Sequence, residues 1–188
     1  MNVSNNKRFQ ETEKRIQNCV LDLIDQDPDT QLTVSAICEV LSINRSSFYI
    51  HHKSVQSVLD SILARFHKEQ MDLCSSGCEL SAASPLSVTM QTTVKYLVRH
   101  QSFYCYYAKY SNSAFLYGQY IQELLKLLSP SVPLLHDLSE LQIAYLGEFI
   151  QGGVISMLKR WLENNREDSC QEIVDLFTSV ISSLDGRL

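Results

Sequence analysis

The stretch that decides the fold reads TVSAICEVLSINRSSFYIHHKS, residues 33–54. Thr33 precedes an apolar helical pattern, which predicts a short helix with Thr33 as its N-cap. A brief break follows at 42–44, and a second short helix is expected from Arg45 to about His52. Two short helices separated by a turn of three or four residues are typical of a helix-turn-helix unit.

The second of these helices has two unlike faces. Phe48 and His52 are four residues apart, so they share a face. That face is expected to pack against three apolar residues, Ile37, Leu41 and Ile43. The opposite face and its flank present Arg45, Ser46, Ser47, Tyr49, His51 and Lys53. Such groups suit hydrogen bonds to base edges in the DNA major groove and to phosphates, but an ordinary helical hairpin with a solvated face has the same spacing. Both interpretations stay open at this point.

The remaining sequence is helical in pattern as well, and no stretch shows useful β-alternation, so the fold class is all-α. An amphipathic helix is expected from Phe9 to the breaker at 25–28, and Ser54 is expected to cap a longer helix. Residues 74–85 are small, polar and rich in serine, which is typical of a linker. Further helices are expected at 85–100, at 103–128 with a break at 111–113, at 134–164 and at 170–184, with a loop at 129–133.

The net charge is spread unevenly along the chain. The 188 residues carry a net charge of −5, but residues 1–68 hold eight basic and eight acidic side chains. The acidic surplus therefore lies entirely in 69–188. A uniformly acidic chain would argue against nucleic acid, whereas a neutral N-terminal part is compatible with modest non-specific DNA affinity.

The six cysteines lie mostly within apolar helical patterns, as structural thiols do. The first residues are polar and lack the apolar core of a signal peptide, and no apolar run approaches the roughly 18 residues that cross a bilayer. We therefore expect a cytoplasmic protein with reduced thiols and no membrane partner. Because Cys74 and Cys78 have no second Cys or His pair at ligand spacing, neither a metal site nor a cofactor is expected.

Residues 33–54 resemble the DNA-binding signature of the TetR family of transcriptional regulators. That signature opens its second helix with Thr, turns through Gly-Val-Ser, and ends its recognition helix in Phe/Leu-Tyr-x-His-Phe before a Ser-Lys-Glu helix start. The likeness covers roughly residues 9–70, and Gly152-Gly153 followed by Trp161-Leu162 is similar to part of many members' eighth helix. It implies a helix-turn-helix DNA-binding domain at 1–53, a connecting helix at 54–73, and an effector-binding and dimerisation domain at 74–188.

The resemblance also implies roles for the polar residues of the signature. Thr33, Tyr49, His51 and Lys53 would contact phosphates, Arg45, Ser46 and Ser47 would face bases, and Lys7 and Arg8 would form a short arm. These assignments make up the expected DNA-binding site.

Ser46 and Ser47 replace the usual Gly-Thr of the family signature, a mild change, and three further departures bear on function. Ser42 stands in place of the turn glycine, which the left-handed backbone of such a turn favours. His52 replaces a core Phe, and Val55 replaces a phosphate-side Lys, although Lys53 lies two positions earlier. The departures support an alternative function, a co-regulator or interaction protein on the same scaffold that does not bind DNA.

The second candidate site is aromatic. Eight of the 17 aromatic residues fall between Phe103 and Tyr120, and in the TetR family this region borders the effector cavity. Tyrosine combines apolar area with a hydroxyl, which suits a pocket for a small organic ligand, although plain core packing uses the same residues. The expected ligand contacts are Met90, Tyr96, His100, Tyr104, Tyr107, Tyr110, Tyr117, Tyr120, Tyr145 and Phe149.

The last two expected helices carry apolar stripes that suit a dimer interface, and packing within the chain is the alternative. The resemblance implies a homodimer on a palindromic operator, acting as a repressor that an unknown small-molecule effector releases. We expect no enzyme, because the sequence offers no nucleophile–base pair.

Overall fold

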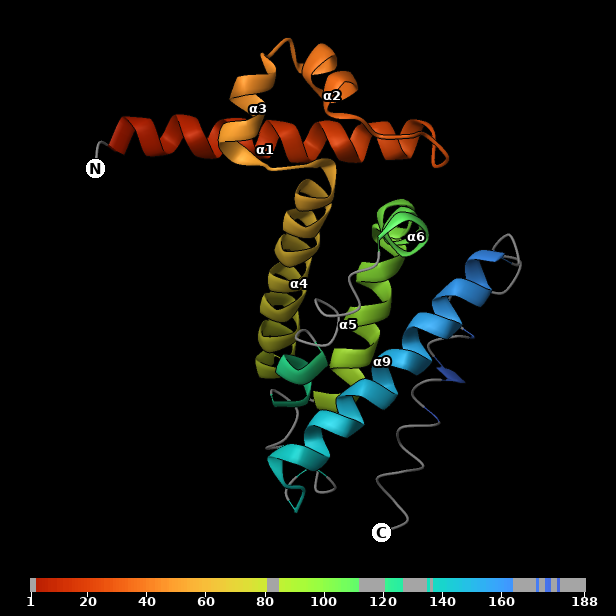
Figure 1. Ribbon diagram of the computed structural model, residues 1–188. Helices are drawn as coiled ribbons and strands as arrows, with labels where there is room; N and C mark the ends of the chain where they lie inside the picture. Colours follow the sequence, from red (N-terminus) through yellow and green to blue (C-terminus); the bar gives the residue numbers. More distant parts are fainter. Residues whose placement is uncertain are drawn as a thin grey trace. The chain divides into compact units, whose positions relative to one another are not determined.

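The computed structural model describes residues 3–80, 85–111, 121–126, 135 and 137–163, and four single residues beyond them, 172, 175, 176 and 179. Its regular elements in these ranges are all α-helices (Figure 1), which confirms the expected all-α fold class. The expected break at 111–113, the loop at 129–133 and the helix at 170–184 fall mostly outside the described residues. None of the helices in the described part is long and apolar enough to cross a bilayer.

Residue contacts divide the chain into two compact units. The first contains residues 1–65 and 102–112, and the second contains 66–101 and 113–188. The long helix α4, Val55–Leu80, contributes residues to both.

The first unit is built on α1, Val3–Gln26, which begins earlier than the expected start at Phe9. Its apolar stripe is fully buried at Ile16, Val20 and Ile24. The short helices α2, Val34–Leu41, and α3, Arg45–His51, pack on α1 and on each other, and Figure 1 shows both on one side of α1. The unit also contains α6, Gln101–Tyr110, apart from its first residue.

The linker expected at 74–85 is wrong for its first half, because α4 continues as a helix through Leu80. The small residues there serve close packing instead. A Cβ added to Gly77 would lie 2.9 Å from Val88 Cγ1 on α5, Pro85–Arg99. Cys74 is fully buried nearby. Small side chains allow two helices to approach closely, and the same residues are common in linkers. Composition alone therefore does not distinguish the two at this place.

The second unit has its own apolar core. Its buried cluster consists of Cys74 on α4, three residues of the helical stretch 121–126, and Leu135. The three residues of that stretch are Ile121, Leu124 and Leu125. Leu138 and two residues of α9, Glu140–Glu163, pack against this cluster from outside; the two are Ile143 and Leu146.

The start of α9 differs from the expected start near residue 134. Ser139 Oγ accepts a hydrogen bond from Gln142 N at 3.3 Å, while Gln142 Oε1 accepts one from Ser139 N at 2.8 Å. This reciprocal pair is a capping box, which fixes a helix N-terminus. Residues 137–139 are accordingly not helical.

Candidate nucleic-acid interface

The turn between α2 and α3 is fully formed. Thr33 caps α2, because its Oγ1 accepts a hydrogen bond from Ala36 N at 3.1 Å, which confirms the predicted N-cap. Ser42 ends the helix with φ 53° and ψ 43°, in the left-handed region. Its N–H bonds Glu39 O at 3.1 Å, and Ile43 N bonds Cys38 O at 3.0 Å. Such closure is usual at helix C-termini with glycine, and here serine adopts the same backbone conformation. The turn therefore forms although Ser42 stands in place of the glycine of the family signature.

The inner face of α3 packs as the spacing predicts. Phe48 is fully buried and His52 nearly so, with ring centroids 5.9 Å apart. Ile37 is also fully buried, while Leu41 and Ile43 are half-buried. His52 therefore occupies the core position that an aromatic residue would fill.

The outer residues of the unit remain accessible. Thr33, Ser46 and Lys53 are exposed, Tyr49 is 54% exposed, and Ser47 is half-buried. This set also includes Arg45, which is exposed and whose Nη2 donates to Ser35 Oγ on α2 at 2.6 Å. Six of the seven expected DNA-contacting residues thus keep solvent-accessible positions on one helix-turn-helix unit.

His51 is the exception. Its side chain is 6% exposed, its Nδ1 lies 3.3 Å from Glu13 Oε2, and its ring stacks on Phe9 with centroids 4.1 Å apart. A side chain enclosed in this way is not placed for the phosphate contact expected of it. The reason is that α1 offers both a carboxylate and an aromatic ring at the end of α3.

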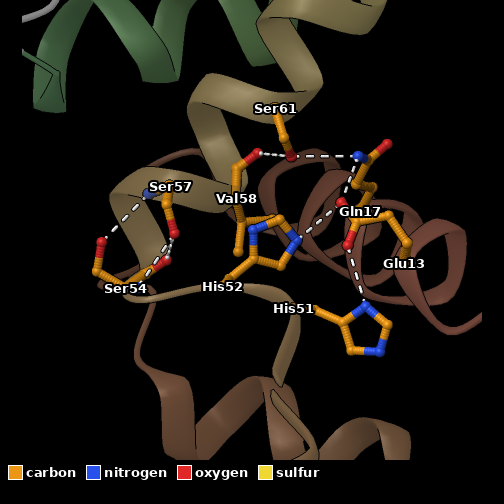
Figure 2. A network of polar contacts seen from close by, with 8 residues as sticks. All are labelled: Glu13, Gln17, His51, His52, Ser54, Ser57, Val58 and Ser61. Carbon is orange, nitrogen blue, oxygen red and sulfur yellow. Dashed lines mark hydrogen bonds and ion pairs between the residues drawn. The ribbon is translucent and has the colours of Figure 1, made fainter. Parts of the chain in front are cut away.

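Glu13 lies at the centre of a polar network that sequence reasoning missed (Figure 2). Its Oε1 is 2.9 Å from His52 Nε2 and also accepts a hydrogen bond from Gln17 Nε2 at 2.9 Å. Gln17 donates further to Ser61 Oγ on α4 at 3.1 Å, and Ser61 Oγ donates to Val58 O at 2.8 Å. One signal could have revealed it, because Gln17 is a polar residue within the apolar stripe of α1 and is only 6% exposed.

Two serines cap α4, as the sequence predicts for Ser54. Ser57 N donates to Ser54 Oγ at 3.2 Å, and Ser54 N donates to Ser57 Oγ at 3.1 Å (Figure 2). This reciprocal cap starts α4 directly after Lys53, so the chain leaves α3 in a fixed direction.

The tyrosines of α6 contact the reading head, the part of the first unit formed by α1, α2, α3 and the first residues of α4. Tyr106 OH donates to Thr30 O at 3.1 Å, in the loop that precedes α2, and burial raises the pKa of Tyr106. Tyr107 is buried, and its OH donates to Asp60 Oδ1 on α4 at 2.9 Å. Lys109 Nζ pairs with Asp29 Oδ1 at 2.6 Å. The hydroxyls of Tyr106 and Tyr107 are therefore both hydrogen-bonded to residues of the first unit.

The expected ligand residues have unlike surroundings. Tyr96 and Tyr104 are buried, and the half-buried His100 packs its ring on Phe66 and Tyr96. Tyr110 is 41% exposed. Tyr117, Tyr120 and the side chain of Met90 lie outside the described residues.

Two expected ligand residues on α9 are placed otherwise than in a cavity of this chain. Tyr145 and Phe149 are 70% and 77% exposed, and Leu141, four residues earlier, is 66% exposed. The spacing of four puts all three on one outward stripe. Gly152 and Gly153 continue along the same helix and are exposed as well. The placement of Tyr145 and Phe149 in a pocket is thus corrected.

The described residues define a helix-turn-helix protein with a second helical unit, and comparisons with known proteins agree with this class. Residues 87–183, just over half of the chain, match the family model for the C-terminal region of TetR transcriptional regulators. The chain belongs to the TetR family of transcriptional regulators, whose members regulate transcription and are not enzymes. No match was found among curated proteins.

Solved structures show the same fold at low sequence identity. A TetR-family transcriptional regulator from Syntrophomonas wolfei matches with a TM-score of 0.74 and 16% identity, over 95% of this chain and 97% of that one. The fatty acid degradation regulator FadR from Bacillus halodurans matches with a TM-score of 0.67 and 16% identity, over 94% of this chain and 95% of that one. The dihydroxyacetone kinase operon activator DhaS matches with a TM-score of 0.64 and 16% identity, over 92% of this chain and 95% of that one.

Proposed function

We propose that this regulator binds a palindromic DNA operator as a homodimer and acts as a repressor that a small-molecule effector releases. The observation that carries the proposal is the exposed outer face of α3, on a turn closed by hydrogen bonds from Ser42 N and Ile43 N. In this scheme residues 1–53 read DNA, 54–73 connect, and 74–188 bind effector and pair with the second copy.

The DNA contacts follow from exposure and chemistry. Thr33, Tyr49 and Lys53 contact phosphates, because a hydroxyl, a phenol and an ammonium are accessible there. Arg45, Ser46 and Ser47 face bases: the guanidinium has donors beyond the one that bonds Ser35. His51 has no part in this set because its side chain is enclosed.

The homodimer forms through the outward stripe of α9. Leu141, Tyr145 and Phe149 expose a contiguous apolar row, and monomeric proteins rarely leave such a row in water. An added Cβ at Gly152 or Gly153 would meet no atom within 4 Å, so a second helix has room to approach there. Leu176, 55% exposed, belongs to the expected last helix and is a further apolar side chain available for the interface.

The effector site is proposed in the second unit, near Tyr96 and His100. Tyr96 OH donates to Glu69 Oε2 at 2.7 Å. The rings of Tyr96 and His100 both pack on Phe66 from α4. An aromatic cluster on α4 and α5 suits a small organic ligand and lies on the helix that leads to the reading head. The alternative, a co-regulator without DNA binding, keeps the support of Val55, which stands in place of a phosphate-side Lys.

Selection of bound duplexes from a random-sequence library separates the two functions. A DNA-binding regulator enriches one palindrome, whereas a co-regulator enriches nothing. Replacing Lys53 by Ala should weaken binding at every sequence and lower the salt dependence by about one released counterion. Lys68→Ala, on the exposed surface of α4 in the second unit, is the matched control and should leave binding unchanged.

A further inference from the structure

We infer that Glu13 of α1 is a positioning residue for the recognition helix, acting through His51 and His52 and not through contact with DNA. The inference rests on the proposed DNA binding of α3. It assigns to the two histidines an inward role in place of a phosphate contact.

Both oxygens of one carboxylate hold the end of α3. Oε2 of Glu13 lies 3.3 Å from His51 Nδ1, and Oε1 lies 2.9 Å from His52 Nε2 (Figure 2). The histidine side chains are 6% and 5% exposed, and that of Glu13 is 23% exposed. Partial removal from water strengthens such electrostatic contacts with a carboxylate.

The carboxylate is itself held in place. Gln17 Nε2 donates to Glu13 Oε1 and to Ser61 Oγ, so the same network reaches α4. One polar network thus joins three helices: Glu13 of α1 contacts the end of α3, and Gln17 of α1 contacts α4 (Figure 2).

Helix α3 packs on α1 and α2, and Arg45 Nη2 donates to Ser35 Oγ near its N-terminal end, but few side chains anchor its C-terminal end. It is seven residues long, and its N-cap Asn44 makes no side-chain cap hydrogen bond. Phe48 is the fully buried side chain within this helix, and the contacts of Glu13 add a second anchor at its C-terminal end. The two histidines lie between the proposed phosphate contacts Tyr49 and Lys53 in the sequence, so fixing the histidines fixes the positions from which those residues reach DNA.

The sign of one substitution tests the inference. Glu13→Gln and Glu11→Gln each remove one negative charge from α1, and Glu11 is exposed. Electrostatics alone predicts that both variants bind the enriched duplex slightly more tightly. A positioning role predicts that Glu13→Gln binds about tenfold more weakly, the size expected for losing the contacts of a partly buried charged group. Its salt dependence should equal that of the wild-type chain, since no phosphate contact is lost.

A double-mutant cycle shows whether Glu13 acts through the histidines. In a His51→Gln/His52→Gln background, Glu13→Gln should produce no further loss of affinity. Glu13→Asp retains the charge and should recover part of the affinity. It also serves as the second variant if Glu13→Gln lowers the unfolding temperature below that of the assay.

The outcomes distinguish the two levels of the proposal. If the wild-type chain enriches no duplex, the proposed function fails. If the wild-type chain binds and Glu13→Gln binds as tightly as Glu11→Gln, or if the loss is the same with the histidines replaced, the positioning role is overturned.

Discussion

The hydroxyl of Tyr106 donates a hydrogen bond to the backbone carbonyl oxygen of Thr30, at 3.1 Å. The hydroxyl oxygen of Tyr106 in turn accepts a hydrogen bond from Leu32 N at 3.5 Å, so one side chain of α6 holds the loop that leads into the capped start of α2. Tyr107 and Lys109 on α6 make two more contacts with this unit, to Asp60 and Asp29. Helix α6 is thereby part of the structure that presents the recognition helix.

Tyr106→Phe should lower the free energy of unfolding by about 1 kcal/mol, because it leaves a loop carbonyl without its donor. Tyr49→Phe makes the same chemical change where the side chain is 54% exposed, and should alter stability by less than about 0.5 kcal/mol. Urea unfolding followed by circular dichroism measures both. Equal stability of the two variants would show that the contact contributes nothing.

Ser42→Gly should stabilise the protein by about 0.5–1 kcal/mol, because glycine adopts the left-handed conformation of residue 42 without a Cβ penalty. Ser46→Gly, within α3, should have the opposite effect, a loss of about 0.5–1 kcal/mol from greater freedom of the unfolded chain. The pair can be compared in one urea series. A destabilised Ser42→Gly variant would contradict the strained turn.

Acid should destabilise the second unit through His67. Burial lowers the pKa of His67 to about 4, below its ordinary 6.5, so the folded chain stays neutral where the unfolded chain takes up a proton. His67 therefore costs no stability above pH 6.5, and stability falls as the pH drops from 6.5 toward 4, by up to about 3 kcal/mol. In His67→Gln this part of the pH dependence should be missing. A parallel pH profile of unfolding for the two proteins would refute the assignment.

Phe149→Glu should convert the dimer to a monomer, because it places a charge in the middle of the outward stripe of α9. Asn18→Glu adds the same charge on the exposed surface of α1 and should leave the dimer intact. Light scattering at micromolar concentration gives the molar mass of each. A wild-type monomer, or a dimer that survives Phe149→Glu, would remove this interface.

Local signals made the helix-turn-helix unit predictable. The N-cap at Thr33 and the four-residue spacing of Phe48 and His52 depend on neighbours in sequence, and both are as expected. The end of α4 was missed because small residues such as Gly77 serve linkers and close helix packing alike. The start of α9 was missed although Ser139 and Gln142 have capping-box spacing.

The candidate site was less predictable because its decisive contacts join distant residues. Nothing near His51 in sequence indicates that Glu13 and Phe9 enclose it. An apolar stripe also does not reveal which way it faces, so Tyr145 and Phe149 suggested a pocket and are exposed instead. Burial and long-range pairing are properties of the packed chain and are not encoded in spacing alone.

The most direct test of the central claim is the selection of duplexes from a random library by the purified chain, with affinity then measured for the enriched sequence. We predict one palindrome, which a dimer binds and whose affinity falls in Lys53→Ala and Tyr49→Phe. A folded dimer that enriches no sequence would contradict it.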